Sequence, residues 1–204
     1  MPTDSLTPKG RQTRQAIEQA ARKLFAERGF HGTTLADITS AAGRSSAVFY
    51  RYFADKEDLL AALAESFLHD VVEPSGLSVH LPESPYDDAF FTSVVTGYWN
   101  MFKQNIGIMI AVAQLAATQQ RFAAVQNEFR RFGMNIVAAS VRRAQQQGYG
   151  TELDPQHIAA AIALLFENFT TVFVGTTSLG LDIGDEDAIK ILSTIWKKTL
   201  YGGA

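Results

Sequence analysis

The sequence predicts an all-α fold in which a small N-terminal three-helix module precedes a larger helical body. Apolar residues recur at steps of three and four along most of the 204 residues, which is the spacing of one helix face. Capping residues and glycines stand where these periodic segments begin and end. No segment shows the strict alternation of a half-buried strand, so we expect helices only.

The first four predicted helices have recognisable ends. Gly29 follows the first periodic segment and is expected to stop it. Thr34 and Asp37 have the spacing of a capping box for the second helix, and either Ser45 or Ser46 can cap the third. An aspartate repeats the capping pattern before the fourth. The predicted spans are residues 11–28, 34–43, 45–53 and 55–67.

Five further helices are predicted in the body. A proline-rich loop, residues 74–85, separates them from the first four. Asp154 followed by Pro155 is a cap with proline at the first helical position. The last helix begins with three acidic residues and ends with two lysines, the charge order that the helix dipole favours. The predicted spans are residues 87–104, 106–118, 119–147, 154–173 and 185–198.

Composition excludes several classes of protein. There are no cysteines, which excludes disulfides, thiolate metal sites and cysteine nucleophiles. The N-terminus lacks the basic and then apolar run of a secretory signal. The longest uncharged stretch, residues 104–120, contains several amides and is shorter than the roughly 20 apolar residues of a membrane span. We therefore expect a water-soluble cytoplasmic protein that does not enter a membrane.

Catalytic spacings are poor throughout the chain. The segment 43–47 is one glycine short of a hydrolase nucleophile elbow and has no strand before it. The four histidines lack metal-ligand spacing, and Gly175 and Gly180 are not followed by the Lys-Ser or Lys-Thr of a phosphate loop. We predict no enzyme, no catalytic residue, no metal and no cofactor.

Charge is distributed unevenly. Residues 1–53 carry eight Lys or Arg and four acidic side chains, a net charge of +4, whereas the whole chain carries -3 and the remainder therefore -7. Such asymmetry favours a polyanionic partner for the basic end.

The second and third predicted helices have the design of a helix-turn-helix. The turn at residues 42–44 contains a glycine, and the small residues Ser45, Ser46 and Ala47 would let the next helix approach a DNA backbone closely. Tyr50 and Tyr52 could donate hydroxyls to phosphate or could belong to the small core. The neighbouring Phe49 and Phe53 are expected in that core.

The run from Gly32 through Ala42-Gly43, the segment Ser45 to Phe53 and the segment Asp55 to Leu60 together resemble the TetR family of bacterial regulators. The resemblance covers roughly residues 11–60 and implies a domain division at residue 58, with a DNA-binding domain of residues 1–58. Two positions depart from the family pattern: Arg44 replaces an apolar residue such as Val, and Ala47 replaces Gly or Pro. Base preference therefore cannot be carried over, and Arg44 could read guanine or hold a phosphate. The implied DNA contacts are Thr34, Arg44, Ser45, Ser46, Ala47, Tyr50, Tyr52 and Lys56.

The resemblance further implies that residues 59–204 bind a small-molecule effector and form a homodimer. Aromatic residues of the body could line a pocket for an apolar or aromatic effector, or could be ordinary core. The candidate ligand contacts are Phe91, Tyr98, Phe102, Met109, Phe129, Phe166 and Phe169.

The last two long helices would pair across a two-fold axis, and the stripe Ala188, Leu192, Ile195, Trp196 and Thr199 is a candidate for that contact. A dimer with two symmetric reading helices would require a pseudo-palindromic operator. The expected function is a ligand-responsive repressor of transcription. The competing interpretation is a helical adaptor that binds proteins and never touches DNA.

Overall fold

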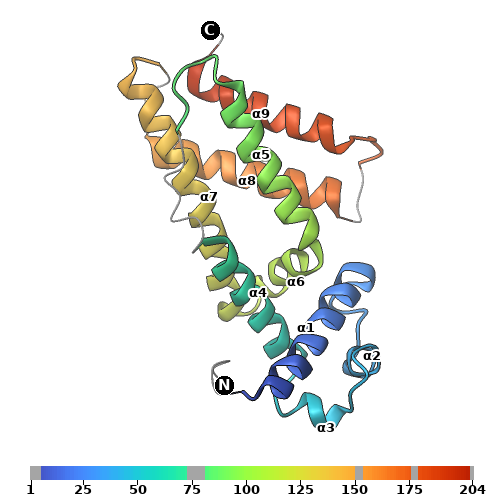
Figure 1. The fold of residues 1–204 in the computed structure, drawn as a ribbon. Coiled ribbons are helices and arrows are strands. Elements are labelled where there is room, and N and C mark those ends of the chain that lie inside the picture. The colour runs from blue at the N-terminus through green and yellow to red at the C-terminus, as the bar shows by residue number, and fades with distance from the viewer. Residues whose placement is uncertain (1–5, 73–80, 150–153, 176–178, 203–204) are drawn as a thin grey trace. The chain divides into compact units, whose positions relative to one another are not determined.

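The computed structural model describes residues 6–72, 81–149, 154–175 and 179–202, and within these ranges it contains helices and no strand (Figure 1). This confirms the all-α prediction. Most of the predicted loop at 74–85 lies outside the described residues, as does part of the segment 175–184 between the last two predicted helices. The helices of the described chain are α1 (Pro8–Arg28), α2 (Leu35–Ala41), α3 (Ser46–Phe49), α4 (Lys56–Val72), α5 (Asp88–Gln104), α6 (Ile106–Ala116), α7 (Gln120–Gln146), α8 (Pro155–Val174) and α9 (Asp185–Tyr201).

The predicted caps are present. The Thr34 hydroxyl accepts from the Asp37 amide at 3.2 Å while the Asp37 carboxylate accepts from the Thr34 amide at 2.8 Å, so the capping box of α2 is complete. Ser45, and not Ser46, caps α3 by accepting from the amide of Val48. Asp154 caps α8 by accepting from two backbone amides. Each cap satisfies donors that a helix start leaves without an intrahelical partner.

Several helix ends differ from the prediction: α4 continues to Val72 and α9 to Tyr201, and two other ends have a clear local cause. α1 begins at Pro8 and not at residue 11, because Thr7 caps it and proline at the first position loses no hydrogen bond. α3 ends at Phe49 and not at residue 53. The amides of Arg51 and Tyr52 bond to the carbonyls of Val48 and Phe49, three residues back, and so continue the segment as a tighter turn.

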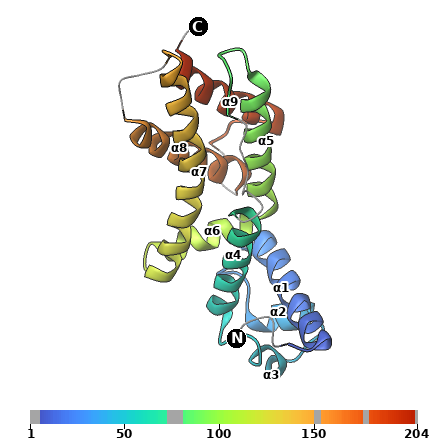
Figure 2. The same ribbon diagram turned by 60° about the vertical axis from the view of Figure 1, so that its left-hand side comes forward.

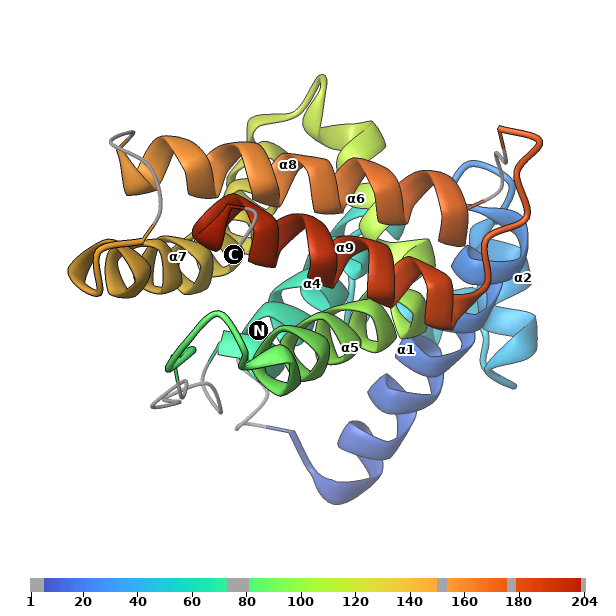
Figure 3. The ribbon, with the colours of Figure 1, turned by 90° about the horizontal axis from the view of Figure 1, so that it is seen from above.

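The chain forms two compact units. The first contains α1 to α4, up to Asp70, together with Asn105–Gln126, and the second contains residues 71–104 and 127–204. Within the first unit, α1 packs on α2 and α6, and Figure 2 shows α3 at the end away from α6. Within the second unit α9 packs along α5, as Figure 3 shows from above. α7 begins in the first unit and continues in the second.

Each unit has its own aromatic core. In the first, Phe25, Phe49 and Phe53 are buried between α1, α3 and the segment that follows α3. In the second, the buried Trp196 of α9 contacts the rings of Phe90 and Phe91, and its indole N–H donates to the Ser140 hydroxyl at 3.2 Å. Because each unit buries its own apolar side chains, damage to one core is expected to spare the other.

α8 is the one helix among the described residues that is long and apolar enough to cross a membrane by length and composition. Its inward side is formed by buried residues such as Ile158, Ile162 and Phe166. Glu167, in its second half, forms a two-pronged ion pair with Arg130 of α7 at 2.7 and 2.9 Å. A core helix of a water-soluble protein passes the same test of length and composition, so this property alone carries little weight.

Candidate nucleic-acid interface

The turn between α2 and α3 needs glycine at one position. Gly43 has φ +62°, a left-handed conformation that side chains with a Cβ rarely adopt. The amide of Gly43 donates to the Ser40 carbonyl and that of Arg44 to the Thr39 carbonyl at 2.9 Å, so the last carbonyls of α2 are satisfied within the turn. The backbone therefore reverses tightly and α3 follows α2 at once, as in a helix-turn-helix.

One side of α3 packs against the core of the first unit, and its opposite side is exposed to solvent. Phe49 is fully buried and packs against the ring of Phe53 at 5.6 Å between centroids. On the opposite side all side chains are exposed, and Tyr50 leaves 61% of its surface accessible. We call this outward surface the contact face; it consists of Arg44, Ser45, Ser46, Ala47 and Tyr50.

The contact face is cationic and sterically open. Arg44 donates to the carbonyl of its neighbour Gly43, and Arg51, just beyond the face, is exposed. Within the described part of the chain neither guanidinium forms an ion pair with a carboxylate. Both charges are therefore available to a polyanion, and the small side chains between them present no obstacle to it.

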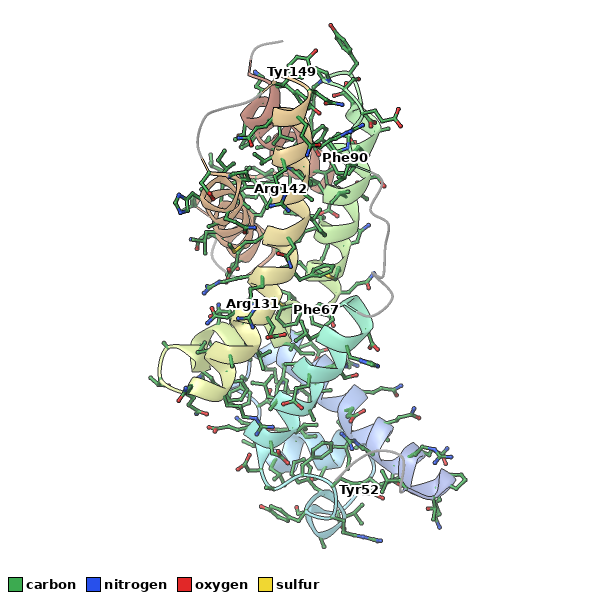
Figure 4. The ribbon with its side chains drawn as sticks, turned by 90° about the vertical axis from the view of Figure 1, so that its left-hand side faces the viewer. Tyr52, Phe67, Phe90, Arg131, Arg142 and Tyr149 are labelled. Atoms are coloured by element: carbon green, nitrogen blue, oxygen red, sulfur yellow. The ribbon has the colours of Figure 1, made fainter. Side chains whose placement is uncertain are left out.

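Three of the predicted DNA contacts have partners inside the first unit. The Thr34 hydroxyl is engaged with Asp37, and this bond holds the pKa of Asp37 below its usual value. Tyr52, labelled in Figure 4, is half-buried, and its hydroxyl lies near Gly10 at the start of α1. Lys56 donates to two backbone carbonyls. The structure thus gathers five of the eight predicted residues on one face and gives the other three internal contacts.

The candidate ligand residues do not form one set. Met109 lies on α6 in the first unit, whereas the other six lie in the second. Of these six, Phe91, Phe102 and Phe166 are buried and the remainder are half-buried. Tyr98 lies between Phe102 and Phe166, with ring centroids 5.9 and 5.7 Å away, and burial raises the pKa of its phenol. These contacts describe an aromatic cluster of α5 and α8.

A groove of about 700 Å³ lies in the second unit between α5 and α9. Phe91 is the one candidate ligand residue on its wall, and Thr92, Ser193 and Lys197 are typical of the rest. Lys197 is bound to Asp88 of α5 at 2.6 Å. The groove is therefore more polar than the aromatic cluster from which the sequence predicts a pocket.

The outward side of α8 and α9 carries large apolar residues. Leu165 is 40% exposed and Ile195 36%, and Leu164 and Ile191 lie beside them with similar exposure. Of the predicted α9 stripe, Ala188, Leu192 and Trp196 instead face the core of their own chain. The helical period of apolar residues does not distinguish the exposed face of α9 from its buried face, because apolar residues occupy both.

Sequence reasoning did not single out Gly107 of α6. A Cβ on this residue would lie 2.5 Å from the backbone nitrogen of Ala26 and 2.6 Å from the carbonyl carbon of Phe25, so only glycine lets α6 approach α1 this closely. Nearby, Arg22 of α1 donates to the Asn105 side chain at 3.0 Å. Nothing in the local pattern marks this contact, since its partners are more than 80 residues apart.

Comparison with known proteins supports the same family. Residues 17–63 match the model described as bacterial regulatory proteins, tetR family. The HTH-type transcriptional repressor AcnR of Corynebacterium glutamicum is 38% identical over 68 residues, a segment that covers 32% of this chain and 36% of that repressor. This match therefore spans only about a third of the relative's length.

Two longer similarities extend through the body. The HTH-type transcriptional regulator EthR of Mycobacterium tuberculosis strain H37Rv is 26% identical over 200 residues, which cover 96% of this chain and 90% of EthR. The crystal structure of the transcriptional regulator FadR from Bacillus subtilis, in complex with stearoyl-CoA, has a TM-score of 0.65 at 19% identity and covers 93% of this chain and 99% of that one. The latter shows a shared fold.

The glycine turn, the exposed cationic α3 and the matched segment agree: residues 17–63 belong to the TetR family of bacterial regulatory proteins, and the full-length similarities extend the likeness through the body.

Proposed function

We propose that this protein represses transcription by binding operator DNA through α3 and is released by a small effector. The observation that carries the proposal is the contact face, which is exposed, cationic and lined with small side chains. A helix of this kind fits the major groove of B-form DNA, where Arg44 can reach a base edge or a phosphate. An adaptor that binds only proteins has no need of a bare cationic helix after a glycine turn.

The functional form is proposed to be a homodimer. Leu164, Leu165, Ile191 and Ile195 expose apolar surface on α8 and α9, and a second copy would remove it from water. Two copies related by a two-fold axis present two contact faces, so the operator is a pseudo-palindrome. We also propose that the DNA-binding domain ends at residue 58 and that residues 59–204 form the effector-binding and dimerisation domain.

The effector is proposed to bind in the second unit beside the aromatic cluster. Tyr98, Phe102, Phe166 and Phe169 contribute aromatic surface from α5 and α8, and Tyr98 adds a hydroxyl that could orient a polar group. FadR, which shares the fold, is described with stearoyl-CoA bound. An apolar or aromatic effector is therefore the class to test first, in a thermal-shift screen.

A salt titration on selected DNA tests the central proposal. Duplexes bound by the full chain are first selected from a random pool, and the affinity is then measured at several salt concentrations. We expect Arg44→Ala to weaken binding at least about tenfold, because it removes a charge-assisted hydrogen bond to DNA. If Arg44 holds a phosphate, the slope of log affinity against log salt falls by about 0.9 for each phosphate that is no longer neutralised. If it reads a base, preference relaxes at one operator position.

Arg142→Ala is the matched control, because Arg142 is exposed on α7 in the second unit. Its removal should leave affinity, slope and base preference unchanged. Absence of any selected duplex, or binding that does not respond to salt, would instead support the adaptor.

The proposed dimer predicts a second result. Ile195→Asp places a carboxylate on the outward side of α9, where a partner would have to bury it, and should shift the protein toward monomer. Sedimentation across a concentration series measures the shift. Asn135→Asp, which adds the same charge at an exposed position of α7, should leave the assembly unchanged. A dimer that survives Ile195→Asp with equal affinity would place the interface elsewhere.

A further inference from the structure

The groove between α5 and α9 lies between two helices whose register is set by ion pairs. Lys197 of α9 binds Asp88 of α5 at 2.6 Å, and Lys103 of α5 binds Asp185 of α9 at 2.6 Å. The two helices therefore run antiparallel, and the middle of one lies opposite the middle of the other (Figure 3). At about 700 Å³ the groove falls in the range of roughly 300–1,000 Å³ that small-molecule sites occupy.

Buried side chains form the floor of this groove. Phe91 and Tyr201 are both buried, and their rings meet edge to face with centroids 6.3 Å apart. Ser193 is also buried and donates its hydroxyl to the Phe91 carbonyl at 3.4 Å. These contacts join α5 and α9 beneath the groove, so its shape does not depend on a bound molecule.

Two threonines of α5 line the groove with hydroxyls that are not otherwise used. Thr92 and Thr96 form part of the wall, and neither hydroxyl has a hydrogen-bond partner within the described ranges. A threonine in a helix can donate to the carbonyl three or four residues back, and Thr171, Thr194 and Thr199 all do so. The two α5 hydroxyls are therefore free to donate to a molecule in the groove.

The charges that remain on the wall are mostly positive. Lys190 and Lys198 form no ion pair in the part of the chain that the structure describes, whereas Lys197 is held by Asp88. Among the described wall residues, Glu186 is the one carboxylate outside an ion pair. The uncommitted groups are mainly cations and donors, which favours a ligand that brings acceptors and negative charge.

We propose that this groove binds a small organic carboxylate, held between the Lys190 ammonium and the Thr96 hydroxyl. The register places these residues opposite each other, because each lies about midway between the ion-paired residues of its own helix. Ile189, half-buried on the same wall, supplies apolar surface beside them. The site is distinct from the proposed effector site, since the aromatic cluster around Tyr98 does not line the groove, and it does not depend on DNA binding.

Titration of the free, full chain with benzoate, and separately with octanoate, tests the proposal through amide chemical shifts. We expect saturable shifts at Thr96 and Lys190, and none with benzamide, which keeps the ring of benzoate without its charge. Added salt should weaken binding, because ions screen an exposed charge pair. The proposal is overturned if neither carboxylate gives saturable shifts, if benzamide shifts the same amides equally, or if the shifts are confined to the aromatic cluster.

Two substitutions test the position of the carboxylate. Lys190→Gln removes the charge and should weaken benzoate binding at least about tenfold, the loss expected for a charge-assisted hydrogen bond. Thr96→Val keeps the shape but not the hydroxyl and should weaken binding about fivefold.

The matched controls are Lys23→Gln and Thr199→Val. Lys23 is exposed on α1 in the first unit, and the Thr199 hydroxyl donates to the Ile195 carbonyl away from the groove wall. Both variants should bind benzoate as the wild type does. Wild-type affinity in Lys190→Gln would contradict the proposal, whether or not an operator is found.

Discussion

Phe49→Ala should unfold the reading end of the protein while the second unit stays folded. Phe49 is fully buried and contacts the rings of Tyr50 and Phe53. α3 has only four residues, too few to be stable alone, so its conformation depends on this anchor. Truncation of a buried phenylalanine costs about 3–5 kcal/mol, a large part of the stability of a small unit.

The expected measurements are a loss of detectable operator binding and an early unfolding transition in urea, followed by a later one from the second unit. Tyr50→Ala is the control, because Tyr50 lies next in the chain but is 61% exposed. It should change stability by no more than about 0.5 kcal/mol while it weakens DNA binding. Equal stability of Phe49→Ala and wild type would mean that α3 does not depend on its buried side.

Gly107→Ala should destabilise the first unit, although alanine normally favours a helix. Replacing glycine within a helix by alanine usually adds about 0.5–1 kcal/mol. Here the new Cβ would meet backbone atoms of Phe25 and Ala26 at 2.5 to 2.8 Å, and backbone atoms cannot rotate away. α6 must therefore move off α1, at an expected cost of about 1–3 kcal/mol.

Gly133→Ala on α7 provides the matched control, since a Cβ there meets nothing within 4 Å. It should stabilise the protein, so the two substitutions are expected to differ in sign when unfolding is followed by urea titration. Faster exchange of the α1 and α6 amides should accompany Gly107→Ala. If both substitutions stabilise the protein to the same extent, Gly107 of α6 does not lie in close contact with the backbone of α1.

The local rules predicted the DNA-binding part in detail because its determinants are short-range. A capping box needs residues three apart, and the turn at Gly43 needs one glycine, so both can be recognised in a single segment. The same rules did not predict the internal hydrogen bonds of Lys56. Its carbonyl partners lie 26 and 23 residues earlier, at a distance that spacing patterns do not cover.

The rest of the chain shows the same contrast between short-range sequence signals and long-range packing. Periodicity and capping were enough to predict the helices of the chain and where most of them begin and end. They also showed that the N-terminal part resembles a DNA-binding module. These signals depend on neighbours within a few residues. Packing in three dimensions was needed to show that Ile195 faces outward while Trp196 is buried, that Met109 belongs to a different unit from Phe91, and that Gly107 must be glycine. These outcomes depend on which surfaces approach each other in space, and an amphipathic period does not specify the partner against which a face packs.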